Sequence, residues 1–182
     1  ISYAITNGSG CTTTVTRAVT VNANPAVNAL TGTNTVCVGL TTTFSSITAG
    51  GTYSSSNTGV ATVNSSTGVI TGAAAGTATI SYAVTNGNGC TTTVTRVVTV
   101  NALPIDITPI ATSPTVCPGS STSIQIATSQ PGVNYQLRNN ATNSAIGSAV
   151  AGTGGTINLP TDALSSATTY NVLATNTSTT CS

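Results

Sequence analysis

Residues Gly76–Val100 read GTATISYAVTNGNGCTTTVTRVVTV, and this stretch predicts two β-strands joined by a tight turn. Every second residue from Ala78 to Val84 is apolar, and Thr77, Thr79, Ser81 and Thr85 lie in the opposite phase, which is the period-two pattern of a half-buried antiparallel strand. Asn86–Gly89 alternates Asn and Gly, two residue types that tolerate the positive φ of a turn. Thr91–Val100 carries valines in one phase, so we expect the two halves to form a β-hairpin.

The hairpin sequence occurs twice. Ile1–Pro25 and Ile80–Pro104 differ at four of 25 aligned positions, and Cys11 aligns with Cys90 in their turns. A second echo, Thr-Val-Cys-x-Gly, aligns Cys37 with Cys117 at almost the same spacing. Two markers that agree on the spacing predict a repeating structural unit, of which residues 25–103 are one copy.

The repeat predicts three units along the chain. Residues 1–24 are expected to be the C-terminal hairpin of one domain, residues 25–103 a complete domain, and residues 104–182 a third domain that lacks its last strand. The boundaries fall at Pro25 and Pro104, because proline suits a strand end or a short linker. A single hairpin is marginally stable alone, so we expect a longer protein with further repeats on both sides.

Composition predicts an all-β fold. Threonine, which is β-branched and favours strands, supplies 41 of the 182 residues. Frequent turn signals divide the complete unit into about seven short strands, which is the pattern of an immunoglobulin-like Greek-key β-sandwich. Besides the hairpin, we expect a kinked strand at Ala26–Val36, then Thr41–Ile47 with Phe44 inward, Thr52–Ser56, Ala61–Val63, Val69–Thr71, Ser123–Ala127, Val133–Arg138, Thr156–Leu159 and Thr168–Thr175.

Arg96 lies in the apolar phase of its strand. Either a β-bulge turns its side chain away from the core, or the side chain reaches solvent from the edge of the sheet.

The scarcity of charge excludes several functions. The chain has three arginines, two aspartates and no His, Lys or Glu, so it cannot supply the cation cluster of a nucleic-acid interface. Cysteine and serine have no histidine base to activate them, and Asp106 and Asp162 do not form a credible acid–base pair. The cysteines are too scattered for a zinc site. No apolar run is long enough for a transmembrane helix. We therefore expect a non-enzymatic protein without metal or cofactor.

Two segments carry a resemblance to known families. SSSNTGVATVNSSTGVITGAAAGTATISY, at Ser54–Tyr82, resembles the core motif of bacterial Ig-like domains of the second group. Cys37 with Gly39, followed later by Asn-Gly-Cys at Asn88–Cys90, resembles the PKD-like tandem repeats of giant Bacteroidetes surface proteins, including gliding-type adhesins exported by type IX secretion. The third-strand tryptophan usual in such domains is missing, and Tyr53 stands in its place. The resemblance implies an extracellular, cell-surface protein.

Five cysteines in such a chain predict disulfides in an oxidising compartment. One arrangement stays within domains, as Cys37–Cys90 and Cys117–Cys181. The other crosses the junction, as Cys37–Cys181. In both, the partner of Cys11 lies outside the segment. The first and last strands of a domain are expected to end at the same pole, which favours the crossed pairing, although one miscounted strand would reverse the conclusion.

The expected function is structural: a disulfide-stabilised spacer in a bacterial extracellular filament or adhesin stalk. Its partners would be neighbouring domains of the same chain and other copies of it, since nearly uncharged threonine-rich faces do not repel one another. The alternative is an adhesive module that binds glycans or surface protein through loops such as Gln130–Asn134 or Arg138–Gly147. The tyrosines Tyr3, Tyr82 and Tyr170 follow the core phase of their strands, so we expect them to be buried rather than to stack on sugars.

Overall fold

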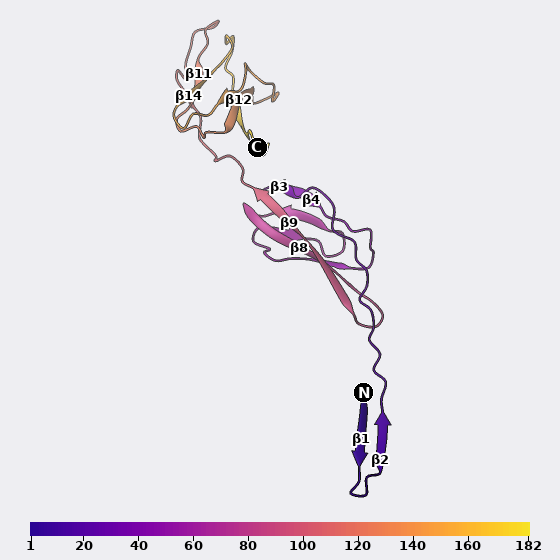
Figure 1. The fold of residues 1–182 in the computed structure, drawn as a ribbon. Coiled ribbons are helices and arrows are strands. Elements are labelled where there is room, and N and C mark those ends of the chain that lie inside the picture. Colours follow the sequence, from indigo (N-terminus) through magenta and orange to yellow (C-terminus); the bar gives the residue numbers. More distant parts are fainter.

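The computed structural model describes residues 1–182 and is all-β, with no helix and therefore none that could cross a membrane. The strands form one isolated hairpin and two pairs of small sheets (Figure 1). In order they are β1 Ser2–Thr6, β2 Thr12–Thr16, β3 Thr35–Cys37, β4 Thr41–Thr43, β5 Thr52–Ser55, β6 Ala61–Val63, β7 Val69–Gly72, β8 Gly76–Thr85, β9 Thr91–Asn101, β10 Ile110–Ala111, β11 Ser123–Ile126, β12 Val133–Asn139, β13 Val150–Ala151, β14 Ile157–Pro160 and β15 Tyr170–Asn176.

Strands β3 to β9 form what we call the middle sandwich. One sheet has the order β3-β9-β8-β5 and the other β4-β7-β6. The predicted hairpin is its longest element, with β8 and β9 paired from Gly76↔Val100 to Thr85↔Thr91. The alternating residues of β8 point into the core, as the sequence predicted. Twelve buried side chains fill the space between the sheets: Leu30, Val36, Phe44, Tyr53, Ala61, Ile70, Ala78, Ile80, Tyr82, Val84, Val98 and Val100.

The prediction of a kinked strand over Ala26–Val36 was wrong for most of its length: only Thr35–Cys37, β3, forms a strand there. Thr31 bridges Ser45 beside one sheet, whereas β3 joins the other sheet by pairing in parallel with β9. Gly32 lies between the two contacts with φ of 125°. A Cβ at this position would clash with the carbonyl oxygen of Thr43, so only glycine allows the chain to change sheets here.

Arg96 does not sit at a β-bulge, so that sequence-based alternative was wrong. It pairs with Ile80 in an uninterrupted ladder. Its guanidinium donates hydrogen bonds of 3.0 Å to the carbonyl oxygens of Leu30 and Gly32 and lies 5.3 Å from the centre of the Phe44 ring. These contacts give hydrogen-bond donors to two carbonyl groups of the segment that precedes β3, and they hold the guanidinium over the Phe44 ring.

We predict that Arg96→Ala lowers the free energy of unfolding of the middle sandwich by about 2–3 kcal/mol. Two carbonyl groups lose a charged donor in this variant, and Phe44 loses a cation. Denaturant unfolding monitored by circular dichroism measures the change. Arg17 is the matched control: it holds the repeat-equivalent position and is exposed. An equal effect of Arg17→Ala would show that the Arg96 contacts contribute nothing specific.

Strands β10 to β15 form the C-terminal sandwich, whose sheets have the orders β10-β11-β14 and β13-β12-β15. The two-residue strands β10 and β13 were not predicted. The core of the C-terminal sandwich is smaller than that of the middle sandwich and consists of seven buried side chains. They are Ile124, Ile126, Val133, Tyr135, Leu137, Ile157 and Leu159.

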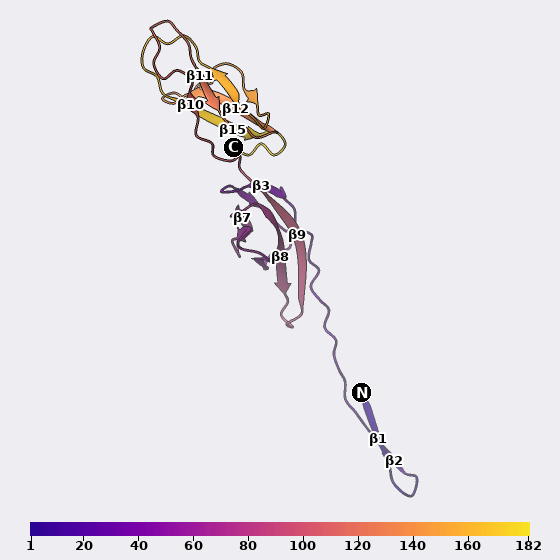
Figure 2. The same ribbon diagram turned by 90° about the vertical axis from the view of Figure 1, so that its left-hand side faces the viewer.

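Strands β1 and β2 form the N-terminal hairpin, which contacts no other sheet. Figures 1 and 2 show it at one end of an elongated molecule, joined to the middle sandwich by an extended segment. The prediction that Tyr3 is buried was wrong: it is 66% exposed, whereas Tyr82, its repeat equivalent, is 4% exposed. The reason is that no second sheet packs on the hairpin. Tyr170, at the start of β15, is half-buried.

Candidate functional site

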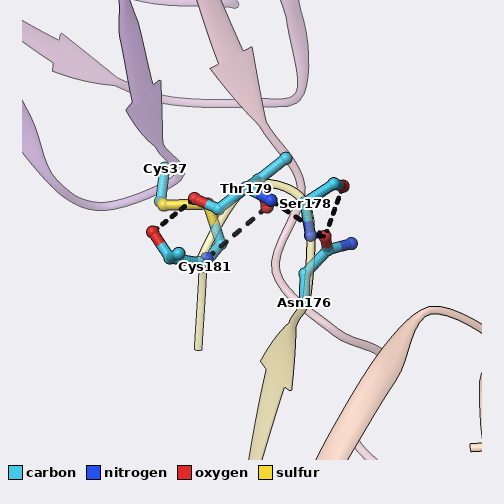
Figure 3. Close-up of a disulfide and its surroundings, with 6 residues drawn as sticks. Cys37, Asn176, Ser178, Thr179 and Cys181 are labelled. Carbon is cyan, nitrogen blue, oxygen red and sulfur yellow. Dashed lines mark hydrogen bonds between the residues drawn. A yellow bond between two sulfur atoms is a disulfide. The ribbon is translucent and has the colours of Figure 1, made fainter.

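A disulfide between Cys37 and Cys181 joins the middle and C-terminal sandwiches (Figure 3). The two residues are 144 apart in sequence, and their Cα atoms are 5.6 Å apart. Cys37 ends β3, and it is in register with Asn101, the last residue of β9. The chain leaves the middle sandwich after Asn101, so the disulfide lies beside the linker that connects the two sandwiches.

The turn after β15 holds Cys181 in place. The Asn176 side chain accepts hydrogen bonds from the backbone N–H groups of Ser178 and Thr179 at 3.0 and 3.1 Å, and the Asn176 N–H donates to the Cys181 carbonyl at 2.9 Å. Figure 3 shows Asn176, Ser178 and Thr179 gathered beside the disulfide. Cys181 is only 1% exposed, so its sulfur is covered as well as oriented.

The structure does not have the within-domain pairings Cys37–Cys90 and Cys117–Cys181. Cys90 precedes β9, whereas Cys37 lies beside the last residue of that strand. The extended length of β9 separates the two ends by about 35 Å, far beyond the reach of a disulfide. Cys11, Cys90 and Cys117 are free thiols in this structure, with Cys11 and Cys117 exposed.

The turn that carries Cys181 has a close counterpart in the middle sandwich. Asn86 accepts hydrogen bonds from Asn88 and Cys90, and its N–H donates to the Cys90 carbonyl at 3.0 Å. This turn contacts the incoming linker: the Asn86 amide donates to the Ala23 carbonyl at 2.9 Å, and the Cys90 sulfur lies 3.7 Å from the Asn22 carbonyl oxygen. Asn22 is the repeat equivalent of Asn101, so both junctions bring a turn cysteine close to the same position of the repeat.

The loops considered for ligand binding use their polar groups within the fold. The Gln130 side chain accepts a hydrogen bond from the Ile105 N–H, and the Arg138 guanidinium donates to the Asn171 side chain at 3.1 Å. These contacts fix the loops against neighbouring segments of the C-terminal sandwich. Asp106 and Asp162 are both exposed.

The buried tyrosines belong to the core of the middle sandwich rather than to a binding face. The rings of Tyr53 and Tyr82 have centres 4.5 Å apart. The Tyr82 hydroxyl donates to the Thr48 carbonyl and accepts from the Gly51 N–H, both at 2.8 Å. Burial, together with the neighbouring Tyr82, raises the pKa of Tyr53, and a backbone hydrogen bond with Ser46 acts in the opposite direction.

No protein-family model matches the chain, and no curated protein sequence matches it significantly. The geometry of the junction therefore carries the functional argument.

Proposed function

We propose that this chain is a structural segment of a bacterial extracellular filament or adhesin stalk, in which disulfides staple adjacent β-sandwich domains to one another. The observation that carries the proposal is the Cys37–Cys181 bond, because it links one sandwich to the next instead of closing a loop inside one of them. A disulfide in this position constrains how the two sandwiches are oriented relative to each other.

The disulfide gives the junction a second covalent connection. A single linker allows bending and rotation between domains. Here β3 and β9 end side by side, and both ends are tied to the C-terminal sandwich, one through Cys37 and one through the linker after Asn101. Two adjacent connections limit both bending and rotation, which suits a spacer that must keep a fixed length and bear a tensile load.

The disulfide and the sequence repeat both support an extracellular spacer. A stable disulfide requires an oxidising compartment, which a bacterial cell surface provides. The near-repetition of Ile1–Pro25 at Ile80–Pro104 also suits a spacer, since a spacer needs the same unit many times.

Immunogold labelling of the producing cells, combined with cryo-electron microscopy of the labelled material, tests the proposal. Antibodies against residues 25–182 should label surface fibres that show a regular repeat of one domain. Label confined to the cell interior, or to compact particles without a repeat, would contradict it.

A further inference from the structure

The segment that enters the middle sandwich runs along the whole length of strand β9. We call Asn22–Cys37 the strap. Near its start, the Ala23 carbonyl accepts a hydrogen bond of 2.9 Å from the Asn86 side chain, in the turn that precedes β9. At its end, Cys37 is in register with Asn101, the last residue of β9. The strap therefore connects the two ends of the sandwich, which lie about 35 Å apart by the extended length of β9.

The disulfide makes the strap part of a short covalent route through the protein. A pull that enters before Asn22 and leaves after Cys181 passes along the strap and across the Cys37–Cys181 bond. Residues 38–180 form a closed loop beside this route, and the loop contains every strand from β4 to β15. Tension follows the shortest covalent path, because bond lengths and bond angles barely yield. The loop therefore carries almost no tension once the strap is taut.

Without the disulfide, the same pull would have to cross the middle sandwich itself. It would enter through the strap and leave through the end of β9 at Asn101, which continues into the linker. The strap and β9 would then slide past each other in opposite directions, because β3 pairs in parallel with β9 and the two are pulled at opposite ends. Loss of this pairing would expose the core and release the whole chain.

The strap is not straight, so it can lengthen a little before it is taut. An extended chain from Asn22 to Cys37 could reach about 50 Å, whereas its ends lie about 35 Å apart, which leaves about 15 Å of slack. The slack lies where the strap changes sheets. There Thr31 bridges Ser45 beside the second sheet, and the Leu30 side chain is buried in the core.

Arg96 holds the strap in this bent path. Its guanidinium donates hydrogen bonds of 3.0 Å to the carbonyl oxygens of Leu30 and Gly32, on either side of Thr31. Arg96 belongs to β9, which lies in the closed loop and outside the tensioned route. Straightening the strap must therefore break both hydrogen bonds and draw Leu30 out of the core.

We propose that the strap and the Cys37–Cys181 bond carry tension through the protein and leave both sandwiches folded, and that Arg96 sets the force at which the strap straightens. The proposal deepens the spacer role and rests on it for its biological use. The mechanical property itself follows from the fold, so the purified chain is enough to test it. Beyond the N-terminal hairpin, the protein should lengthen only by the slack of the strap.

Magnetic tweezers that pull the full chain by peptide handles at its two ends test the proposal, with the disulfide intact and the free thiols blocked. We expect the N-terminal hairpin to open first and the strap to lengthen next by about 15 Å, with no further step. The double variant Cys37→Ser and Cys181→Ser should instead unfold in large steps. Residues at a sequence separation of 144 release about 500 Å of chain at full extension.

Adding dithiothreitol to a wild-type molecule under tension makes the same change in a protein that has already folded. The Cys37–Cys181 bond is reduced to two thiols, and dithiothreitol is oxidised to its cyclic disulfide. The large steps should appear only after this reaction. A reduced molecule that keeps its length at the forces that the oxidised one withstands would overturn the proposal, because the disulfide would then not be what protects the sandwiches.

Arg96→Ala should shift the small lengthening to a lower force and leave the total length unchanged. Arg17→Ala is the matched control, because Arg17 is the repeat equivalent of Arg96 and is exposed, so its removal should shift nothing. An unshifted lengthening in Arg96→Ala would overturn the role of Arg96. Peptide mapping of the same protein batch separates these failures from failure of the spacer role, since only the absence of the Cys37–Cys181 bond would remove both.

Discussion

Tyr82→Ala is expected to destabilise the middle sandwich by about 3–5 kcal/mol, which is the usual cost of removing a fully packed aromatic side chain. Tyr82 is 4% exposed, and its ring is tilted against that of Tyr53. Its hydroxyl forms hydrogen bonds with the backbone of Thr48 and Gly51. The substitution therefore leaves a cavity and two backbone groups without their partner. Urea unfolding followed by circular dichroism measures the loss.

The repeat provides an internal control for this experiment. Tyr3 stands in the same local sequence but is 66% exposed. Tyr3→Ala should therefore change the free energy of unfolding by less than about 0.5 kcal/mol. Tyr82→Phe keeps the ring and removes only the hydroxyl, so its cost should be about 1–3 kcal/mol. Equal losses for Tyr3→Ala and Tyr82→Ala would mean that the N-terminal hairpin is packed in a core of its own.

Removal of the junction disulfide by the double variant Cys37→Ser and Cys181→Ser should have the second large effect. The bond joins residues at a sequence separation of 144. In the chain-entropy model, a disulfide that closes so long a loop stabilises the folded protein by about 5 kcal/mol, because it lowers the entropy of the unfolded chain. The denaturant midpoint should fall, and small-angle X-ray scattering should show a wider range of angles between the two sandwiches. The double variant avoids leaving one cysteine free to pair elsewhere.

Cys117→Ser is the matched control for the disulfide variant. Cys117 is exposed and unpaired in the monomer, so its replacement should change neither the midpoint nor the scattering curve. An unchanged interdomain angle in the double variant would contradict the role of the disulfide in holding the junction, even if stability fell.

Local patterns predicted the fold well wherever one residue pair or turn decides the structure. The alternation in Gly76–Asn86 and the Asn-Gly turn were enough for the β8–β9 hairpin, since both the period and the turn chemistry are local. The short strands β5, β6 and β7 lie within a residue of their predicted ends. The all-β class followed from the abundance of threonine.

Features that depend on distant segments were harder to predict. Arg96 looked like a bulge residue because its partners, the carbonyls of Leu30 and Gly32, lie far back along the chain. Tyr3 and Tyr82 share a sequence pattern, yet only one has a second sheet against it, and periodicity cannot report that difference. The long first strand was predicted as one element because the change of sheets at Gly32 depends on the position of Thr43.

The pairing of Cys37 with Cys181 across the junction could be predicted in part by counting strand directions. The expectation that the first and last strands end at the same pole matches the parallel β3–β9 pair, and this pairing separates Cys37 from Cys90. The covering of Cys181 by its Asn176 turn was not foreseen, although an asparagine followed closely by a cysteine in all three turns is a signal that could have shown it.

Tryptic peptide mapping of the protein without reduction, with free thiols blocked first, tests the central claim most directly. Cleavage after Arg17, Arg96 and Arg138 puts Cys37 and Cys90 in one peptide, residues 18–96, Cys117 in residues 97–138, and Cys181 in residues 139–182. The junction staple predicts a disulfide-linked pair of peptides 18–96 and 139–182. Peptide 139–182 linked instead to 97–138, with 18–96 closed on itself, would show that each disulfide stays inside one domain and would contradict the account.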